Sequence, residues 1–462
     1  MSFHKSCLFP LLLIFSLLLA ACGQTSPEPD PTATPTPPNQ GAPIATLQPG
    51  EPTWTPTPIP FNPTPTLNYE TPNPVQISEL QFLQQENRLV VIAKFQNILE
   101  DAILRDVQFE VLGLDAAGNR IAQEFGGITY LFPRQTTGLV RSFDLIAGVE
   151  TTSVEVHFTG GTPDQKLKYQ QPFTITNPTF FGEDKTATLT GWLENRDDLT
   201  YTEIELNAIA YNANGEIIGG GNANAEFVPP EDRIGVSVPV AITEVPARVE
   251  IYPWISSYSA SLEGGSWWNN IKIEDWNFIL TADHQVAGGA ILTNITDRIL
   301  TGSYYIITVS DEQDQVCLVE KNFINYFLPG EAQYFSPGVL TAPASSSPTH
   351  VDLIVIPGEF GEYDLAYNPL VTSQSILLTD QATPTVRVTV LNNLNASIST
   401  VLVTTLLLDA QGTIIGGGQT YSGALPANSS LDVDVPVAVM GDLENLTINS
   451  SATLPQSATI GQ

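Results

Sequence analysis

Histidines and carboxylates are the first candidates for chemistry in this chain, and the histidines are few. His284 follows Asp283, and His350 lies two residues before Asp352. These four side chains could bind zinc if the two loops that carry them converged. No G-x-S-x-G, H-E-x-x-H or P-loop motif occurs. We therefore favour surface turns for both histidines, and we expect no metal, no cofactor and no catalytic residues.

Tryptophan is concentrated in one short segment. Four of the six tryptophans fall between positions 254 and 276. The candidate residues for a ligand site or an interdomain contact are Trp254, Tyr258, Trp267, Trp268 and Trp276. Exposed indole rings would offer a platform for the apolar faces of sugars. The alternative, which we favour because the segment falls between two repeats, is that the rings pack a junction between the second and third domains.

The N-terminus carries an export signal. An apolar run from Leu8 to Ala21 is 14 residues long, too short for the roughly 20 residues that span a bilayer. It ends in Leu19-Ala20-Ala21-Cys22, which resembles the lipobox of bacterial lipoproteins. The resemblance implies that residues 1–21 are a signal peptide, that Cys22 is lipidated, and that the chain is anchored outside the cytoplasm at the cell membrane.

Cysteine usage agrees with this assignment. Cys7 lies in the signal peptide and Cys22 would carry lipid, which leaves Cys317 as the last of the 3 cysteines. One thiol can form neither an intramolecular disulfide nor a cysteine-based zinc site. It lies in the strand-like stretch QVCLVE, so we expect it to be a small buried side chain.

A proline-rich segment follows the lipobox. Residues 23–75 contain 16 of the 36 prolines, mostly alternating with threonine. Proline fixes φ and lacks a backbone donor, so such a stretch cannot pair into sheets. We predict that residues 22–75 are a disordered tether that holds the folded part away from the membrane.

The rest of the chain repeats about every 98 residues. Three landmarks recur in step in four copies. An asparagine ends a strand-like run at Asn97, Asn195, Asn294 and Asn392; a turn residue follows at Asp115, Asn212, Asp311 and Asp409; a proline follows at Pro133, Pro229, Pro329 and Pro426. The predicted domains are 76–160, 169–252, 271–357 and 368–452, with a Trp-rich connector at 253–270.

Each copy has the sequence pattern of a β-sandwich. Apolar residues alternate in LVVIAKFQ and VRVTVLNN, and Asp-Ala-x-Gly turns separate the runs. The fold class is therefore all-β, with four tandem immunoglobulin-like β-sandwich domains after the tether. The repeated IIGGG at 217–221 and 414–418 could cradle phosphate only before a helix. Strand-like sequence follows, so we predict glycine-containing strands.

One family resemblance emerges from these motifs. AIAYNANGEIIGGG and LLLDAQGTIIGGG, each followed by a proline and a last strand, resemble the FxLYD-type immunoglobulin-like domains of bacterial surface proteins. The phenylalanine that names the family is replaced by Val111, Ala208, Ile307 and Thr405. The resemblance implies a fold and a surface location, and it supplies no catalytic residues.

Charge and repetition limit the function. The chain carries 17 basic and 49 acidic residues, a net charge of −32, which disfavours nucleic acid as a partner. We expect a non-catalytic binding, adhesion or spacer module held at the membrane by its lipid, with a polysaccharide or a protein as partner. Alternatives are an accessory lipoprotein that binds saccharides or an envelope complex, and an extracellular hydrolase with paired carboxylates.

Overall fold

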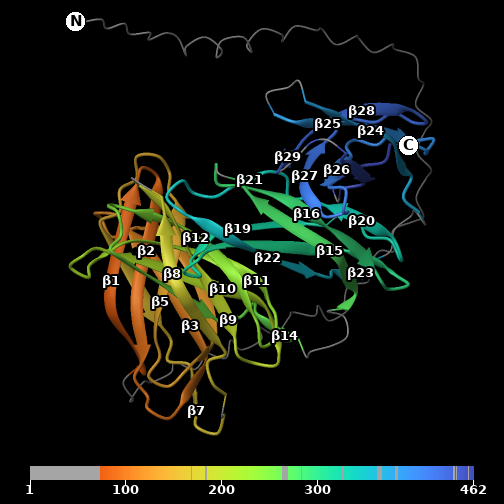
Figure 1. The fold of residues 1–462 in the computed structure, drawn as a ribbon. Coiled ribbons are helices and arrows are strands. Elements are labelled where there is room, and N and C mark those ends of the chain that lie inside the picture. Colours follow the sequence, from red (N-terminus) through yellow and green to blue (C-terminus); the bar gives the residue numbers. More distant parts are fainter. Residues whose placement is uncertain are drawn as a thin grey trace, which may run out of the picture. The chain divides into compact units, whose positions relative to one another are not determined.

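The structure, a computed structural model, describes residues 73–461 except 168, 183–184, 263–268, 282, 325, 362–366, 380–382, 441–442, 444 and 456. These residues belong to one compact unit. They form antiparallel sheets (Figure 1), which confirms the predicted all-β fold. Within this part of the chain, no helix is long and apolar enough to cross a membrane. The predicted signal peptide, Cys22 and the tether up to residue 72 lie outside it.

Sandwich 1 shows the plan that all four copies follow. One sheet has the order β1-β2-β5, and the other has β4-β3-β6 with β7 beside β3. We call the first the A-sheet and the second the C-sheet of each copy. The strands are β1 (Val75–Gln85), β2 (Arg88–Asn97), β3 (Ile103–Leu114), β4 (Arg120–Leu131), β5 (Thr136–Asp144), β6 (Ser153–Phe158) and β7 (Thr162–Asp164). The apolar residues that alternate along β2 and β3 meet between the sheets, among them Leu89, Val91 and Val107.

Sandwich 2 repeats this plan. Its A-sheet is β8-β9-β12, and its C-sheet is β13-β10-β11 with β14 beside β10. Here β11 also pairs with β12 at Gly219 and Gly220, which joins the two into one seven-stranded sheet. The strands are β8 (Phe173–Phe181), β9 (Thr186–Asn195), β10 (Thr200–Tyr211), β11 (Ile217–Val228), β12 (Arg233–Ile242), β13 (Arg248–Trp254) and β14 (Ala260–Leu262). β14 lies within the expected connector 253–270, and its pairing with β10 makes that part of the connector a strand of this sandwich.

Sandwiches 3 and 4 complete the series. The A-sheets are β15-β16-β20, with β21 beside β16, and β24-β25-β28; the C-sheets are β19-β18-β22 and β29-β27-β26-β30, and β17 pairs with β23. In sandwich 3 the strands are β15 (Ile271–Leu280), β16 (Gln285–Asn294), β17 (Ile299–Thr301), β18 (Tyr304–Asp311), β19 (Val316–Phe323), β20 (Ala332–Phe335), β21 (Leu340–Thr341), β22 (Pro348–Ile356) and β23 (Glu359–Gly361). In sandwich 4 they are β24 (Leu370–Leu378), β25 (Thr385–Asn392), β26 (Leu402–Leu408), β27 (Ile414–Tyr421), β28 (Ser430–Pro436), β29 (Ala438–Val439) and β30 (Thr447–Thr453).

The turn landmark of the repeat caps one hairpin in each copy. In the first copy, Oδ1 of Asp115 accepts hydrogen bonds from the backbone N–H groups of Ala117 and Asn119, at 2.9 and 2.8 Å. The same two bonds recur at the other three turn residues. The third residue after the capping side chain has positive φ in every copy and is Gly118, Gly215, Asp314 or Gly412. A short polar side chain and a residue that tolerates this conformation are therefore required at fixed spacing.

The asparagine landmark is a buried cross-link. All four side chains are at most 3% exposed. In each copy Nδ2 donates to backbone carbonyls of two loops, the one that follows the asparagine and the one at the landmark proline. Oδ1 accepts from the N–H two residues later. The nearly constant distance from asparagine to proline, 34 to 36 residues in the sequence, therefore reflects one loop held against another.

Successive sandwiches pack through their sheet faces. In each junction, the A-sheet of one copy meets the C-sheet of the next. Junction 1–2 buries an apolar cluster of Val90, Ile92, Val140, Ile209 and Tyr211. Junction 3–4 buries Leu406, Leu408 and Ile414 beneath Ile291 and Tyr334. Strands of the C-sheets in copies 2 to 4 are therefore covered on both faces, as the fully buried β26 shows.

The two end faces of the series are more polar. On the C-sheet of sandwich 1, the exposed side chain of Gln123 donates a hydrogen bond to the carboxylate of Glu110. On the A-sheet of sandwich 4, Arg387 pairs with Asp434, and Thr389 donates to Asp432. Repeat proteins protect the ends of a packed series in this way.

The glycine triplets lie in strands β11 and β27, as predicted. A Cβ atom on Gly418 would lie 2.0 Å from the carbonyl oxygen of Pro436, so the neighbouring backbone would have to move. We expect Gly418→Ala to destabilise sandwich 4 by about 1–3 kcal/mol. Amide hydrogen exchange of β26 and β27 would measure this. Gly423→Ala is the matched control, because nothing lies within 4 Å of its Cβ position; equal exchange in the two variants would contradict the steric account.

Candidate ligand clefts between the sandwiches

Trp254 lies in the core of sandwich 1, although it ends a strand of sandwich 2. It is 2% exposed and packs edge-on against Phe95 and Phe109, with ring centroids 5.9 and 6.1 Å away. Its indole N–H donates to Oγ1 of Thr137 at 2.8 Å. Trp254 is therefore a junction residue, but it joins sandwiches 1 and 2, whereas our expectation placed the aromatic segment between sandwiches 2 and 3.

The other predicted aromatic residues are placed elsewhere. Tyr258 is 82% exposed. Trp276 on β15 is 42% exposed, and its ring centroid lies 6.0 Å from that of Phe278. Trp267 and Trp268 lie outside the described residues. Among the described members, the structure does not form the single cluster that their nearness in sequence suggested.

Junction 2–3 is organised by a tryptophan that the sequence analysis did not single out. The Trp192 indole N–H donates to the Asp314 carbonyl at 3.0 Å, and the guanidinium of Arg233 lies 3.9 Å from the centre of the Trp192 ring. Arg233 also binds both carboxylate oxygens of Asp314, at 2.7 and 3.1 Å. Asp314 is the residue that replaces glycine in the third turn. That departure from the repeat was the available signal, because it marks a turn with an added role.

A polar network lies in junction 1–2. Lys94 of sandwich 1 is 3.2 Å from the Glu250 carboxylate of sandwich 2, which also accepts hydrogen bonds from the hydroxyls of Tyr211 and Tyr252. Burial favours the neutral form of Glu250, but the hydrogen bonds from Tyr252, Tyr211 and Lys94 outweigh it and lower the pKa of this carboxyl. The network is satisfied internally and therefore acts as a structural contact.

A first cleft, which we call cleft A, opens where sandwiches 1 and 2 meet. Its volume is about 550 Å³, and two strongly exposed rings, Phe125 and Tyr258, are among its lining residues. The others are Glu124, Gly126, Gly127, Arg141, Glu203, Glu205, Asn222, Asn224 and Ser256. Cleft A thus combines exposed aromatic rings with planar polar side chains.

Arg141 is the buried charged residue of cleft A. Its side chain is 6% exposed, and it is held by Glu124 and Glu205, each at 2.7 Å. Its guanidinium also lies 4.8 Å from the centre of the Phe109 ring. Two carboxylates therefore share one positive charge, and the cleft keeps an excess of negative charge.

A second cleft, cleft B, lies where sandwiches 2 and 3 meet and has a volume of about 790 Å³. Aromatic rings line it at Phe227, Tyr304 and Phe360, and carboxylates line it at Glu203, Glu226 and Glu359. The remaining lining residues are Thr202, Leu262, Asn270, Thr301, Gly302, Ile356, Pro357 and Gly358. Glu203 belongs to both clefts, so the two are adjacent on the surface of sandwich 2.

Glu203 is the carboxyl group whose protonation these surroundings perturb. Burial raises the pKa of Glu203, and the negative charge of Glu226 adds to the effect. Lys321, which forms an ion pair with Glu226, acts in the opposite direction. A positive charge placed in the clefts would therefore interact favourably with Glu203.

The residues first considered for chemistry are dispersed. His284 lies in the turn before β16 and has a φ of 58°, and His350 lies on β22 beside Thr349. In the described part of the chain, no group of three or more histidine, cysteine or acidic side chains is placed to hold a metal ion. Cys317 on β19 is 2% exposed, as expected for a buried strand residue, and burial raises the pKa of its thiol.

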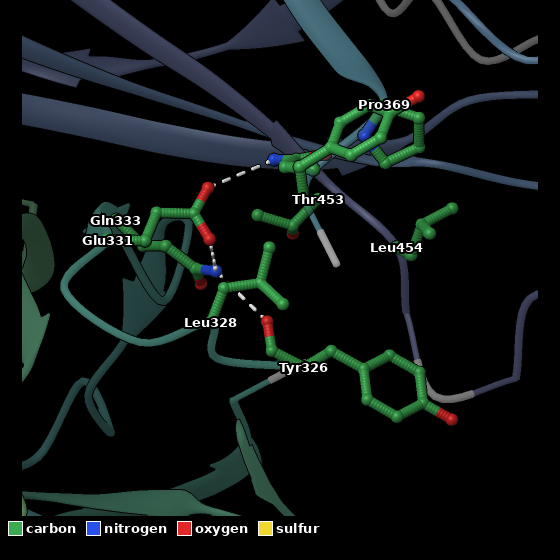
Figure 2. A pocket seen from close by; sticks show the side chains of 9 residues that line it. Tyr326, Leu328, Glu331, Gln333, Pro369, Thr453 and Leu454 are labelled. Carbon is green, nitrogen blue, oxygen red and sulfur yellow. Dashed lines mark hydrogen bonds between the residues drawn. The ribbon is translucent and has the colours of Figure 1, made fainter. Parts of the chain in front are cut away.

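A small cavity between sandwiches 3 and 4 is a packing feature. Its volume is about 10 Å³, room for at most one water molecule. Figure 2 shows Glu331 and Gln333 in contact on one side of it; Gln333 also donates to the Tyr326 carbonyl at 3.0 Å, and Asn368 donates to Glu331 at 3.2 Å. These bonds tie the start of sandwich 4 to sandwich 3.

Comparison with known proteins gives remote likenesses. No family model and no curated protein matches the chain. Among solved structures, it is similar to a β-glucuronidase from glycoside hydrolase family 2, at 11% identity and a TM-score of 0.14, over 54% of this chain and 25% of that one. It is also similar to the exo-chitosanase CsxA of Amycolatopsis orientalis, at 6% identity and a TM-score of 0.15, over 81% of this chain and 91% of that one. A third similar structure is dimeric latent PorU of Porphyromonas gingivalis, at 9% identity and a TM-score of 0.14, over 84% of this chain and 33% of that one. Likenesses this weak carry no argument about function.

Proposed function

We propose that this chain is a lipid-anchored, extracytoplasmic binding protein of a bacterial cell surface, without catalytic activity. The observation that carries the binding role is the pair of adjoining clefts, A and B, lined by exposed rings and polar side chains. Concave sites with a few convergent polar groups are the usual places for ligands. The four packed sandwiches would present these clefts, and the proline-rich tether would set their distance from the membrane.

The location rests on the lipobox-like Leu19-Ala20-Ala21-Cys22. We expect Cys22→Ser to release the protein from the membrane fraction, because two acyl chains give stable attachment and the variant has none. Fractionation with a high-salt wash measures this. Cys7→Ser, in the predicted signal peptide, is the control and should remain anchored. A Cys22→Ser protein that stays in the washed membranes would contradict the anchor.

The binding role has a separate test. Purified protein should be retained on isolated cell envelopes or on a panel of surface polysaccharides without changing them. Loss of retention in Phe125→Ala and Tyr258→Ala would support the clefts as the site. Equal retention of these variants and the parent protein would show that the binding surface lies outside the clefts.

An extracellular hydrolase is the second candidate, and one observation favours it. Glu203 and Glu226 both line cleft B, and the pKa of Glu203 is raised, as suits a general acid beside a second carboxylate. Turnover of a polysaccharide that is abolished by Glu203→Gln would establish this function. Binding without turnover would support the non-catalytic proposal.

A further inference from the structure

We propose that clefts A and B together bind one linear polysaccharide that carries free amino groups. This inference rests on the proposed binding function and names its ligand class. Three observations support it: the two clefts adjoin and share Glu203, they expose aromatic rings, and carboxylates outnumber basic groups along their lining.

The two clefts adjoin along strands β10 and β11 of sandwich 2. Glu203 on β10 lines both clefts, whereas Glu205 and Asn224 face cleft A and Thr202 and Glu226 face cleft B. Each volume, about 550 and 790 Å³, falls within the range of about 300–1,000 Å³ typical of sites for small molecules. A ligand that fills both must therefore be extended, and a chain of linked units fits that requirement.

The rings match the flat apolar faces of sugar units. In cleft A, Phe125 is 67% exposed and Tyr258 is exposed as well, although aromatic side chains are normally buried. In cleft B, Phe360 is 42% exposed, with the guanidinium of Arg298 4.3 Å from its ring centre, and Tyr304 also lines the cleft. Asn222, Asn224 and the carboxylates also line cleft A and offer hydrogen-bond donors and acceptors for hydroxyl and amino groups. A lining that combines rings with planar polar groups suits a ligand with both apolar faces and polar edges.

Charge selects amino sugars among polysaccharides. Among the described residues, five carboxylates and one basic residue, Arg141, line the two clefts. Two further basic groups lie next to cleft B: Lys321 pairs with Glu226, and Arg298 lies over the Phe360 ring. Carboxylates therefore remain in excess. Arg141 already serves Glu124 and Glu205. The whole chain has a net charge of −32, which repels acidic polysaccharides and attracts cationic ones at long range.

Basic peptides carry positive charge as amino sugars do, but the strand edge at cleft A disfavours peptides as ligands. Extended peptides commonly bind by adding a strand to a free sheet edge. At the cleft, the free edge of β4 is already occupied: Thr129 donates to the Ile255 carbonyl at 2.9 Å, and Ser257 donates to the Gly127 carbonyl at 3.3 Å. A peptide lying in the cleft would find few backbone partners there, whereas a sugar chain needs none.

The test compares three hexamers that share one linkage, made of glucosamine, N-acetylglucosamine or glucose. They are titrated by calorimetry into the full-length lipidated protein in detergent micelles, at about pH 6, where exposed carboxylates are ionised. We expect the glucosamine hexamer to bind at least about tenfold more tightly than either neutral hexamer, and higher salt to reduce the difference. The glucosamine dimer should bind more weakly than the hexamer.

Variants locate the site. Phe125→Ala and Tyr258→Ala should each weaken hexamer binding by about 5- to 10-fold through lost ring contacts. Glu203→Gln should reduce affinity for the glucosamine hexamer while leaving that for the glucose hexamer unchanged. Trp276→Ala removes an exposed ring outside both clefts and should bind as the parent protein does.

Four results would overturn the inference. These are equal affinity for charged and neutral hexamers, a dimer that binds as tightly as the hexamer, no effect of the Phe125 and Tyr258 substitutions, and binding of polylysine without any binding of the glucosamine hexamer. If envelopes retain the protein while every hexamer fails, the ligand class is wrong and the binding function stands. If envelopes also fail to retain it, the proposed binding function is wrong.

Discussion

Replacing Asn97 with alanine is expected to destabilise sandwich 1 by about 2–4 kcal/mol, because several buried backbone groups lose their partner at once. Nδ2 of Asn97 lies 3.0 Å from the carbonyl oxygens of Ala102, Leu131 and Phe132, and Oδ1 accepts the Leu99 N–H at 3.0 Å. The asparagine is fully buried, so water cannot replace these bonds without opening the loops.

Amide hydrogen exchange of β2 and β3 measures this effect locally, which matters because a chain of four sandwiches need not unfold in a single step. Asn97→Asp should be at least as damaging. It keeps the shape of the side chain, but a carboxylate oxygen replaces the Nδ2 donor and would face the backbone carbonyl oxygens, which only accept hydrogen bonds. Asn119→Ala is the control: this side chain is exposed and bonds only to its own turn residue Asp115. Exchange in Asn97→Ala that equals exchange in Asn119→Ala would show that the cross-link contributes little.

The repeat could be predicted from the sequence because its landmark residues form hydrogen bonds with groups close to them in the sequence. The turn residues bond to groups two and four residues away, and the asparagines hold the next loop in place. Such short-range requirements fix residue types at fixed spacing. The sandwich fold could be predicted from the strands, because a strand with one buried face shows apolar residues at every second position.

The junctions were harder to predict, because the second buried face of a strand is a tertiary property. Even so, the C-sheet strands held a signal. In sandwich 1, β3 keeps polar residues such as Gln108 and Glu110 on its outer face, whereas β26 in sandwich 4 is buried along its whole length. The loss of alternation in later copies predicts that another sandwich covers them.

The clefts and the position of Trp254 had no comparable signal. Cleft A brings Phe125 and Arg141 of the first copy together with Tyr258, which lies far from both in the sequence. Proximity in sequence suggested that Trp254 and Trp276 act together. In the structure, β13 carries Trp254 back to the preceding sandwich, while β15 begins the next one.

Trp254→Ala should therefore destabilise sandwich 1, although the residue belongs to the second repeat. The substitution removes a large side chain from a core that it shares with Phe95 and Phe109, and it leaves Thr137 without its indole donor. Loss of a buried tryptophan costs about 3–5 kcal/mol when the cavity cannot collapse. The guanidinium of Arg141, which lies 5.7 Å from the centre of the indole ring, also loses one of its two ring contacts and keeps the one to Phe109.

The location of the damage distinguishes this account from a role within sandwich 2 alone. Amide exchange should accelerate in β2, β3 and β5 by at least as much as in β10 and β13. Trp254→Phe should retain part of the protection, because a ring still fills the site while the bond to Thr137 is lost. Tyr258→Ala, four residues along the chain and strongly exposed, should leave exchange in sandwich 1 unchanged. If Trp254→Ala loosened only the strands of sandwich 2, the indole would not be part of the sandwich 1 core, and the contact between the first two copies would have to depend on the cluster around Ile92 and Ile209.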